Sequence, residues 1–239
     1  MRKGPKLIIG VIVAVAVLAL GGTWLYINVI KDDAPAKLSL DDATNATTTT
    51  PAGGAGTTVA PGATGDGIDG TWTATGDSVV GYRAKEVLFG QSTEGVGRTS
   101  AVTGKLTVSG ASVDAASFEV DMTTLKSDEF NRDNQFRGRI METSKYPTAR
   151  FELTSPIDLG SVPAPGVEVT AKATGKLTIK DQTKTVDLDL TAQRDASTIT
   201  VLTNYRVAFA DWGIDDPSFG PAQVEDNALL EIKLVFTKS

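Results

Sequence analysis

The sequence contains no cysteine and no histidine. Without cysteine, the chain can form no disulfide, zinc-thiolate site, iron–sulfur cluster or cysteine nucleophile. Without histidine, it lacks the commonest general base, the commonest zinc ligand and the usual catalytic triad. We therefore expect no enzyme activity, and we predict no catalytic residue, metal site or cofactor.

A surplus of positive charge is also missing. Lysine and arginine total 23 against 29 aspartates and glutamates, which gives a formal net charge of −6. Binding to nucleic-acid phosphates needs lysine and arginine gathered on one face, and the sequence has no such run. The acidity indicates solubility, and we expect no nucleic-acid partner.

A long uncharged apolar run, residues 7–30, lies near the N-terminus. At ~1.5 Å rise per residue, a helix of this length reaches about 30 Å or more, which is enough to cross a bilayer. Arg2, Lys3 and Lys6 would keep residues 1–6 in the cytoplasm and place the rest of the protein outside. The competing interpretation is a cleaved signal peptide, but its apolar region usually spans only ~7–15 residues. The sequence thus favours a retained single-pass anchor in the cell membrane.

The next segment, residues 31–67, is rich in Thr, Ala, Gly and Pro and has no aromatic residue. Such a composition cannot bury enough apolar surface to offset its ordering entropy, so we expect a disordered linker. Asn45, Ala46 and Thr47 match the N-glycosylation triplet, although a plain spacer explains the composition equally well.

Residues 68–239 show a period of two, which is typical of strands with one apolar and one wet face. Phe118, Val120 and Met122, for example, alternate with polar residues. The pattern predicts about eight antiparallel strands in an all-β domain, either a sandwich or a closed barrel. The predicted strands cover residues 79–87, 101–109, 118–122, 149–155, 167–179, 186–190, 199–209 and 230–236. A tight hairpin is expected at residues 179–185.

One polar and aromatic segment, Arg132 to Phe151, interrupts this pattern. Ser127 followed by two acidic residues predicts the N-cap of a short helix that crosses between two strands. The plain structural interpretation is that Arg132 and Asp133 form an ion pair that pins this crossing, while Phe136 and Phe151 belong to the core.

The same segment resembles a known family. The run RDNQFRGRIMETSKYPTARFELTS, the hairpin GKLTIKDQTKTVDLDL at residues 175–190 and YRVAFADWGI at residues 205–214 are similar to the elements of the YceI-like, polyisoprenoid-binding family, and they occur in the same order. The resemblance implies an extracytoplasmic, lipocalin-like β-barrel with an elongated apolar cavity for a long-chain amphiphile. It also implies that nothing is catalysed.

The sequence departs from the family pattern in its histidines. Family members often carry histidine after the Arg-Asp pair and in the first strands, whereas this chain has Asn134, Gln135 and Phe136 after the pair. Any role of such histidines in holding a head group or a metal is therefore in doubt here. The N-terminal anchor is an addition to the plain secreted form.

Two sets of residues are candidates for ligand contact. Inward parity on the predicted strands selects the lumen candidates Tyr82, Phe118, Val120, Met122, Phe151, Leu177, Ile179, Leu188, Tyr205, Val207, Phe209, Ile232 and Leu234. A polar group beside apolar surface selects the rim candidates Arg132, Asp133, Tyr146 and Trp212. Lumen residues could equally fill the barrel, and rim residues could equally stabilise a cap.

These observations favour a membrane-tethered module that holds an isoprenoid or acyl chain. The alternative is a calcium-stabilised or protein-interaction domain, because one loop carries the oxygen ligands Asp211, Asp215, Asp216, Glu225 and Asp226. A hydrolase with paired carboxylates from Asp128, Glu129 and Asp133 ranks third. The oligomeric state cannot be predicted.

Overall fold

The computed structural model describes residues 34–40 and 67–239 of the chain. The predicted membrane span at residues 7–30 and the glycosylation triplet lie outside the described residues. Within residues 34–40 and 67–239, no helix has the length and apolar character needed to cross a membrane. The anchor therefore stays a prediction.

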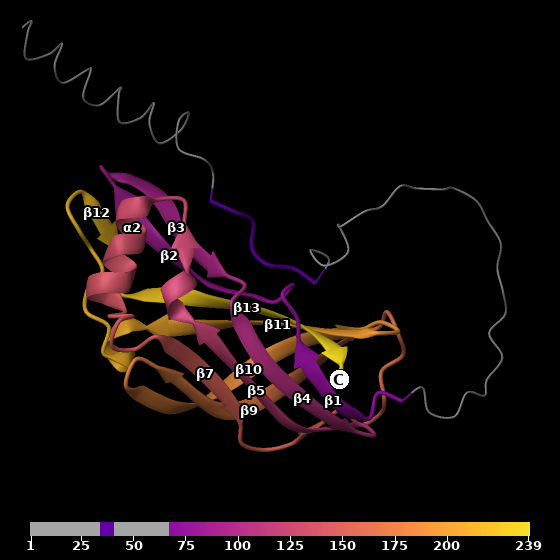
Figure 1. Cartoon of the computed structure of the whole chain (residues 1–239). Helices are drawn as coiled ribbons and strands as arrows, with labels where there is room; N and C mark the ends of the chain where they lie inside the picture. The colour runs from indigo at the N-terminus through magenta and orange to yellow at the C-terminus, as the bar shows by residue number, and fades with distance from the viewer. Residues whose placement is uncertain (1–33, 41–66) are drawn as a thin grey trace, which may run out of the picture.

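Residues 67–239 fold into an antiparallel sheet that closes on itself (Figure 1). Eight strands form the ring, and the prediction of a closed barrel rather than a sandwich is confirmed. In order around the ring they are β1 (Gly70–Ala74), β4 (Val102–Ser109), β5 (Ser112–Asp121), β7 (Thr148–Leu153), β9 (Glu168–Ile179), β10 (Gln182–Arg194), β11 (Thr198–Ala208) and β13 (Asn227–Lys238), and β13 pairs back with β1.

Three further strands extend the barrel on one side. The C-terminal half of β13 pairs with β1, whereas its N-terminal half, from Leu229 to Lys233, pairs with β2 (Val79–Leu88). β2 pairs with β3 (Gln91–Thr99), and β3 pairs with the two-residue strand β6 (Lys126–Ser127). We call β2, β3 and β6 the flap. The short strands β8 (Ile157–Asp158) and β12 (Ala222–Val224) pair with β5 and β2.

The alternation read from the sequence explains how these strands close a core. On β10, Val186 and Leu188 point inward and are buried, while Asp187 and Asp189 point outward and are exposed. Asp189 forms an ion pair with Lys172 of the neighbouring strand at 3.0 Å. Water on one face and side-chain packing on the other fix which parity faces inward.

The predicted hairpin at residues 179–185 is present as a two-residue turn, since Ile179 pairs directly with Gln182. Lys180 in this turn has a φ of 54°. Its ammonium group donates to the carbonyls of Ile140 (3.3 Å) and Gly213 (3.0 Å). The hairpin therefore ties the helical crossing to the loop after β11.

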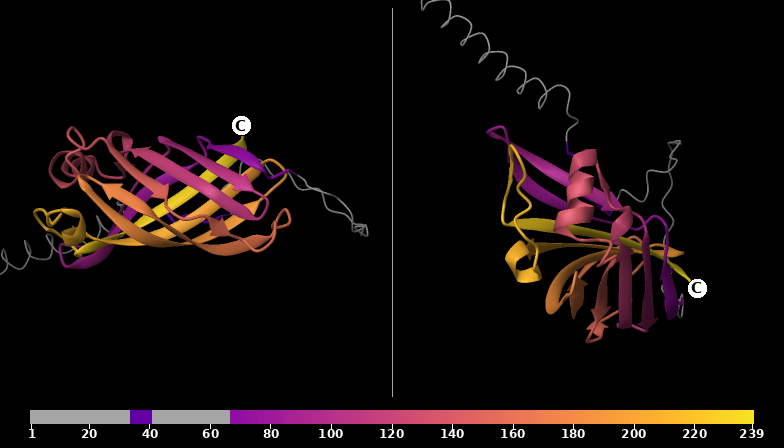
Figure 2. Two further views of the ribbon diagram at one scale, coloured as in Figure 1. Left: turned by 90° about the horizontal axis from the view of Figure 1, so that it is seen from below. Right: turned by 60° about the vertical axis from the view of Figure 1, so that its left-hand side comes forward.

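A helical crossing spans the end of the barrel at which this hairpin lies (Figures 1 and 2). It consists of α2 (Phe130–Gln135) and the π-helical turn η4 (Phe136–Ile140). The predicted N-cap at Ser127 is wrong, because Ser127 ends β6 and Glu129 precedes the helix. Local residue type suggested a cap, but the Ser127 hydroxyl donates to Asp133 instead (2.7 Å).

Three predicted strands end earlier than expected, and one of these ends at Leu153 instead of Ser155. The strands β1 and β3 were missed, as were the short strands β6, β8 and β12. Met122 begins the 3₁₀ turn η3 (Met122–Thr124), and Phe209 begins η5 (Phe209–Trp212). The strands β1 and β3 escaped prediction because β1 is short and β3 is rich in Gly, Ser and Thr. For β3, backbone pairing with β2 outweighs the weak strand propensity of its residues, and this pairing is a tertiary effect.

Residues 34–40, which fall in the predicted disordered linker, lie against the flap (Figure 1). Arg83 donates to the carbonyl of Pro35 at 2.6 Å, and Arg98 donates to the carbonyl of Ala36 at 2.5 Å. Both arginines also bind the buried carboxylate of Glu231, at 2.8 Å each. We call residues 34–40 the strap. Arginines distant in the sequence thus bind carbonyls in this part of the predicted linker, and its disorder stays a prediction.

Candidate functional site

A large cavity opens at the end of the barrel that carries the helical crossing. Its volume is about 780 Å³, and apolar side chains make up most of its wall. Strands of the ring supply one side, including Val120, Leu177 and Leu230. The flap, α2 and the segment before β12 supply the other. We call this space the main cavity and its open end the mouth.

Charged side chains meet at one point of the mouth, between the flap and α2. The guanidinium of Arg132 donates to Glu86 at 2.9 Å and also forms an ion pair with Asp128. Burial alone would lower the pKa of Arg132, but Glu86 and Asp128 more than offset this and raise it. Gly95 makes room for the group, since a Cβ there would lie 2.9 Å from Arg132 Nε. The positive charge of Arg132 is therefore already matched by two carboxylates.

Tyr82 forms the wall beside this pair. Its ring stacks on that of Phe136, with centroids 5.3 Å apart and planes 11° apart. Gly97 lets the ring lie flat on β3, because a Cβ there would lie 2.6 Å from it. Burial raises the pKa of the Tyr82 phenol well above its ordinary value, and the nearby Arg132 lowers it only in part. The phenol is therefore uncharged at neutral pH.

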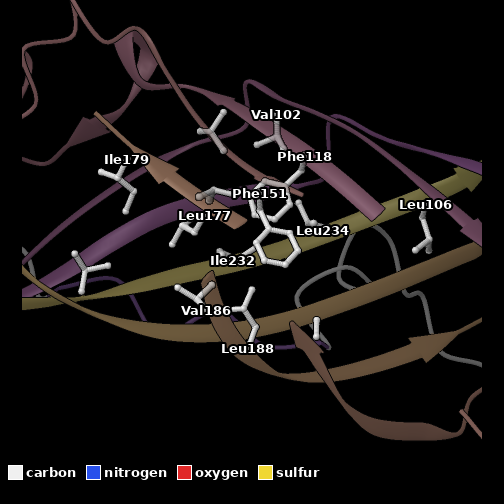
Figure 3. Close-up of a cluster of buried hydrophobic side chains, with 14 of the residues drawn as sticks. Val102, Leu106, Phe118, Phe151, Leu177, Ile179, Val186, Leu188, Ile232 and Leu234 are labelled. Carbon is white, nitrogen blue, oxygen red and sulfur yellow. The ribbon is translucent and has the colours of Figure 1, made fainter. Parts of the chain in front are cut away.

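Phe118 lies at the inner end of the main cavity and stacks on a second phenylalanine, Phe151 (Figure 3). Phe118 of β5 and Phe151 of β7 are direct register partners, and their ring centroids are 5.7 Å apart. Gly175 on β9 makes this possible, because a Cβ there would lie 2.2 Å from the Phe151 ring. We call the two rings the partition.

A second, smaller space of about 130 Å³ lies beyond the partition. Phe118 borders both spaces, whereas Phe151 borders only the second. The wall of the second space is almost wholly apolar and includes Leu188, Ile232 and Leu234. We call it the inner cavity.

The structure divides the predicted lumen residues between these spaces. The main cavity is bordered by Tyr82, Phe118, Val120, Met122, Leu177, Ile179, Val207 and Phe209. The inner cavity is bordered by Phe118, Phe151, Leu188, Ile232 and Leu234. Tyr205 borders neither and packs, partly buried, against the core. Contact of each with a ligand stays a prediction.

The four predicted rim residues do not form one group. Arg132 borders the main cavity, but Trp212 is buried in the core and borders neither cavity. Tyr146 lies at the surface, where Lys145 sits 4.7 Å above its ring and its hydroxyl lies 3.3 Å from Asp181.

The expected ion pair between Arg132 and Asp133 is wrong. Asp133 accepts hydrogen bonds from the amide and hydroxyl of Ser127, at 2.8 and 2.7 Å. Its nearest ion-pair partner is Arg137, at 3.9 Å. Adjacent residues on a helix point in different directions, so Arg132 and Asp133 hold different neighbours.

Several residues of the site were missed by sequence reasoning. Glu86 shares the parity of Tyr82 on β2, and Leu230 shares that of Ile232 on β13, so alternation could have placed both in the wall. Phe89 and Phe219 also border the main cavity, from loops where no periodic signal exists.

The carboxylates proposed for a calcium site or for a hydrolase do not come together in the structure. In residues 34–40 and 67–239, no group of three or more acidic side chains is arranged to hold a metal ion. In the predicted calcium loop, Asp216 instead accepts a hydrogen bond from the amide of Ser218 at 2.8 Å. In the third hypothesis, Asp128 pairs with Arg132 and Asp133 binds Ser127. The geometry gives neither interpretation a site in this part of the chain.

Comparison with known proteins agrees with this geometry. The YceI-like domain matches residues 73–236 of the chain. No curated protein matches the sequence. A similar solved structure is a polyisoprenoid binding domain from Saccharophagus degradans implicated in plant cell wall breakdown, with 15% identity, 71% of this chain and 98% of that chain covered, and a TM-score of 0.58.

A second similar structure is BcnA from Burkholderia cenocepacia, with 20% identity, coverage of 64% of this chain and 95% of that chain, and a TM-score of 0.50. At these identities the two likenesses show the fold alone. The domain match, in contrast, covers more than half of the sequence and bears out the resemblance carried by its motifs. The chain belongs to the YceI-like family.

Proposed function

We propose that this protein binds a long-chain isoprenoid or acyl lipid, holds it outside the cytoplasmic membrane and catalyses nothing. The observation that carries the proposal is the main cavity, whose volume of about 780 Å³ lies inside the range of about 300–1,000 Å³ typical of small-molecule sites. Its wall is apolar, with a few polar groups gathered at the mouth. This arrangement suits an amphiphile whose chain points inward.

Burial of the chain supplies the binding energy. Each methylene moved from water into an apolar site contributes about 0.8 kcal/mol. A few isoprene units therefore provide enough free energy to offset the cost of immobilising the lipid. The likeness to a polyisoprenoid binding domain supports this ligand class.

The charges at the mouth favour an uncharged head group. Arg132 is already held by Glu86 and Asp128, and Glu129 also borders the main cavity. An anionic head would have to displace a carboxylate or lie beside one, whereas an alcohol or carbonyl needs only a hydrogen bond. We therefore propose a neutral lipid such as a polyprenol or a quinone.

The membrane tether rests on the uncharged run at residues 7–30 and on the basic residues that precede it. With this orientation the barrel stands outside the cytoplasmic membrane. A tethered barrel stores lipid beside the bilayer or passes it to a second site within reach.

Lipid extraction from the purified full chain tests the proposal. Mass spectrometry of the organic extract should reveal a neutral amphiphile at close to one molecule per chain. In competition, a polyprenol should displace it better than the polyprenyl phosphate of the same chain length. A full chain that yields no lipid and takes up neither compound would refute the proposal, and a preference for the phosphate would refute the neutral head group.

A further inference from the structure

Three phenylalanines at the mouth of the barrel are unusually exposed. Phe89, Phe219 and Phe130 have relative exposures of 57%, 61% and 74%, the largest among the big apolar side chains of the described residues. Exposed apolar side chains gathered in one place mark interaction sites. We call these three residues the lip.

The lip residues come from three segments that lie at the same end of the barrel (Figures 1 and 2). Phe89 stands in the turn between β2 and β3, and its amide donates to the carbonyl of Pro221 at 3.4 Å. Phe219 lies just before Pro221 and bridges to Ala222, which pairs with Leu88. Phe130 begins α2, whose Arg132 binds Glu86 of β2. Backbone pairing and this ion pair thus hold the lip around the mouth.

The strap shows on which side of the barrel the chain arrives. Pro35 is held by Arg83, whereas Ala36 is held by Arg98, which pairs with Gly81 on β2. Because β2 runs toward the mouth from Gly81 to Leu88, the contact of Pro35 lies nearer the mouth than that of Ala36. The N-terminal end of the strap therefore lies on the mouth side of Ala36.

The distance to the predicted membrane span is short. Only residues 31–33 separate Ile30, the last residue of the apolar run, from Ala34 of the strap. An extended chain covers at most about 14 Å over these four steps. If residues 7–30 cross the bilayer, the flap side of the mouth lies close to the bilayer surface.

We infer that the lip docks into the lipid surface, so that the mouth of the main cavity opens directly into the bilayer. Phe89 and Phe219 both face water and border the main cavity, so a lipid chain leaving the bilayer between them stays in apolar contact throughout. The inference rests on the tether of the proposed function but not on which lipid is carried.

Charge supports a contact with the apolar part of the bilayer rather than with anionic head groups. The chain has a formal net charge of −6, and the arginines near the lip are already bound: Arg132 by Glu86 and Asp128, and Arg139 by the carbonyls of Asp216 and Pro217, at 2.7 and 3.0 Å. Docking should therefore occur on phosphatidylcholine, which carries no net charge, and persist at high salt.

Spin labels on the full chain test the inference, because the absence of cysteine makes each introduced cysteine unique. The variants Phe89→Cys, Phe219→Cys and Phe130→Cys carry a nitroxide at the lip. Val162→Cys and Val167→Cys are matched controls, since both valines are exposed and lie next to the start of β9, at the opposite end of the barrel. Each chain is placed in phosphatidylcholine nanodiscs, where oxygen reports lipid and a soluble nickel complex reports water.

The expected result is that the lip labels are relaxed by oxygen and protected from nickel, while the control labels are relaxed by nickel. Replacing the other two lip phenylalanines by serine should lower the ratio of docked to undocked labels by roughly tenfold for each residue. Phe130 does not border the main cavity, so its label reports docking without disturbing the lipid site.

Two results would overturn the inference. In the first, the lip labels are as accessible to nickel as the controls, which includes the case of a chain that does not associate with nanodiscs. In the second, the lip labels are shielded from both reagents and show spin–spin coupling between chains, so a second copy covers the lip. Lipid extraction is measured separately, so docked labels without extractable lipid would contradict the proposed cargo and leave the docking intact.

Discussion

The two cavities of the barrel share the strands β5, β7, β9, β11 and β13 but differ in the other elements that form their walls. At the inner cavity the ring is complete, with β1 seated between β13 and β4, and side chains leave about 130 Å³. At the main cavity β2 replaces β1 along β13, and helical turns complete the wall around about 780 Å³. Where β1 completes the ring, side chains fill most of the interior. Where the flap takes the place of β1 along β13, a ligand-sized space remains.

The comparison suggests that the inner half of the barrel mainly stabilises the fold, whereas the outer half provides the binding site. The inner half buries aliphatic side chains against one another, which stabilises the fold. The outer half holds Tyr82, Glu86 and Arg132, which cost free energy to bury but give the mouth its polarity. Four predictions test this division.

The largest expected effect comes from paired truncations on β13. Leu234 borders the inner cavity and Leu230 the main cavity, on the same face of one strand. Leu234→Ala should lower the free energy of unfolding by about 2–5 kcal/mol, as in packed cores. Leu230→Ala should lower the free energy of unfolding by clearly less, because one side of the Leu230 side chain faces the main cavity and makes fewer packing contacts. Denaturant unfolding of both variants measures the difference, and equal losses would contradict the division.

The partition depends on a missing side chain at Gly175. In Gly175→Ala the new Cβ would lie 2.2 Å from the Phe151 ring and 2.6 Å from the carbonyl oxygen of Glu152, so the stack must shift. We expect a loss of about 1–3 kcal/mol in the free energy of unfolding. Gly138→Ala is the matched control, since a Cβ there has no atom within 4 Å. A loss of the same size in the control would show that the contact with Phe151 is not the cause.

Removal of the partition should lengthen the ligand that fits. In Phe118→Ala the two cavities join, and a prenyl chain reaches the space now bordered by Leu188 and Ile232. Two additional buried methylenes would shift the preference toward the longer chain by roughly tenfold. Competition between prenols of two lengths, with wild-type protein as reference, measures the ratio. An unchanged ratio would show that the partition does not set chain length.

The smallest effect is a pH dependence confined to the mouth. Because burial raises the pKa of Tyr82, the folded state keeps its proton when the unfolded chain, near its ordinary value of 10.0, has lost it. Stability from this residue is therefore full below pH 10 and falls as the pH rises, by about 1 kcal/mol between pH 10 and 11. Tyr82→Phe should remove that part of the slope in unfolding experiments, and an unchanged slope would assign it to other groups.

Alternation was enough to predict most of the barrel but not its interior. Phe118 and Leu188 each lie on a clear apolar face, so their strands and inward parity could be predicted. The partition could not, because it needs Phe118 to face Phe151 across a ladder and Gly175 to lie beside the ring. The register between two strands, and the close approach of a ring to a glycine on the next strand, depend on both strands. The pattern of one strand alone does not reveal them.

The strap and the mouth show a second limit of sequence reasoning. The composition of residues 31–67 gives no sign that Arg83 and Arg98 bind the carbonyls of Pro35 and Ala36. Similarly, Arg132 and Asp133 are neighbours in the sequence but bind different segments. Polar contacts between distant segments decide both cases, and hydrophobic periodicity carries no information about them.

The flap makes the wall of the barrel unequally resistant to widening. Between neighbouring strands of the ring, separation would break a row of backbone hydrogen bonds. The flap is joined by such bonds to β13 along one edge, and among the residues described here β6 pairs with no strand beyond β3. This edge is held by the short chain segment that links β6 to β5 and by side chains, such as the 2.6 Å contact between the hydroxyls of Thr99 and Thr124. A bulky ligand that pushes outward from inside the barrel would therefore move the flap edge before it separates two strands of the ring.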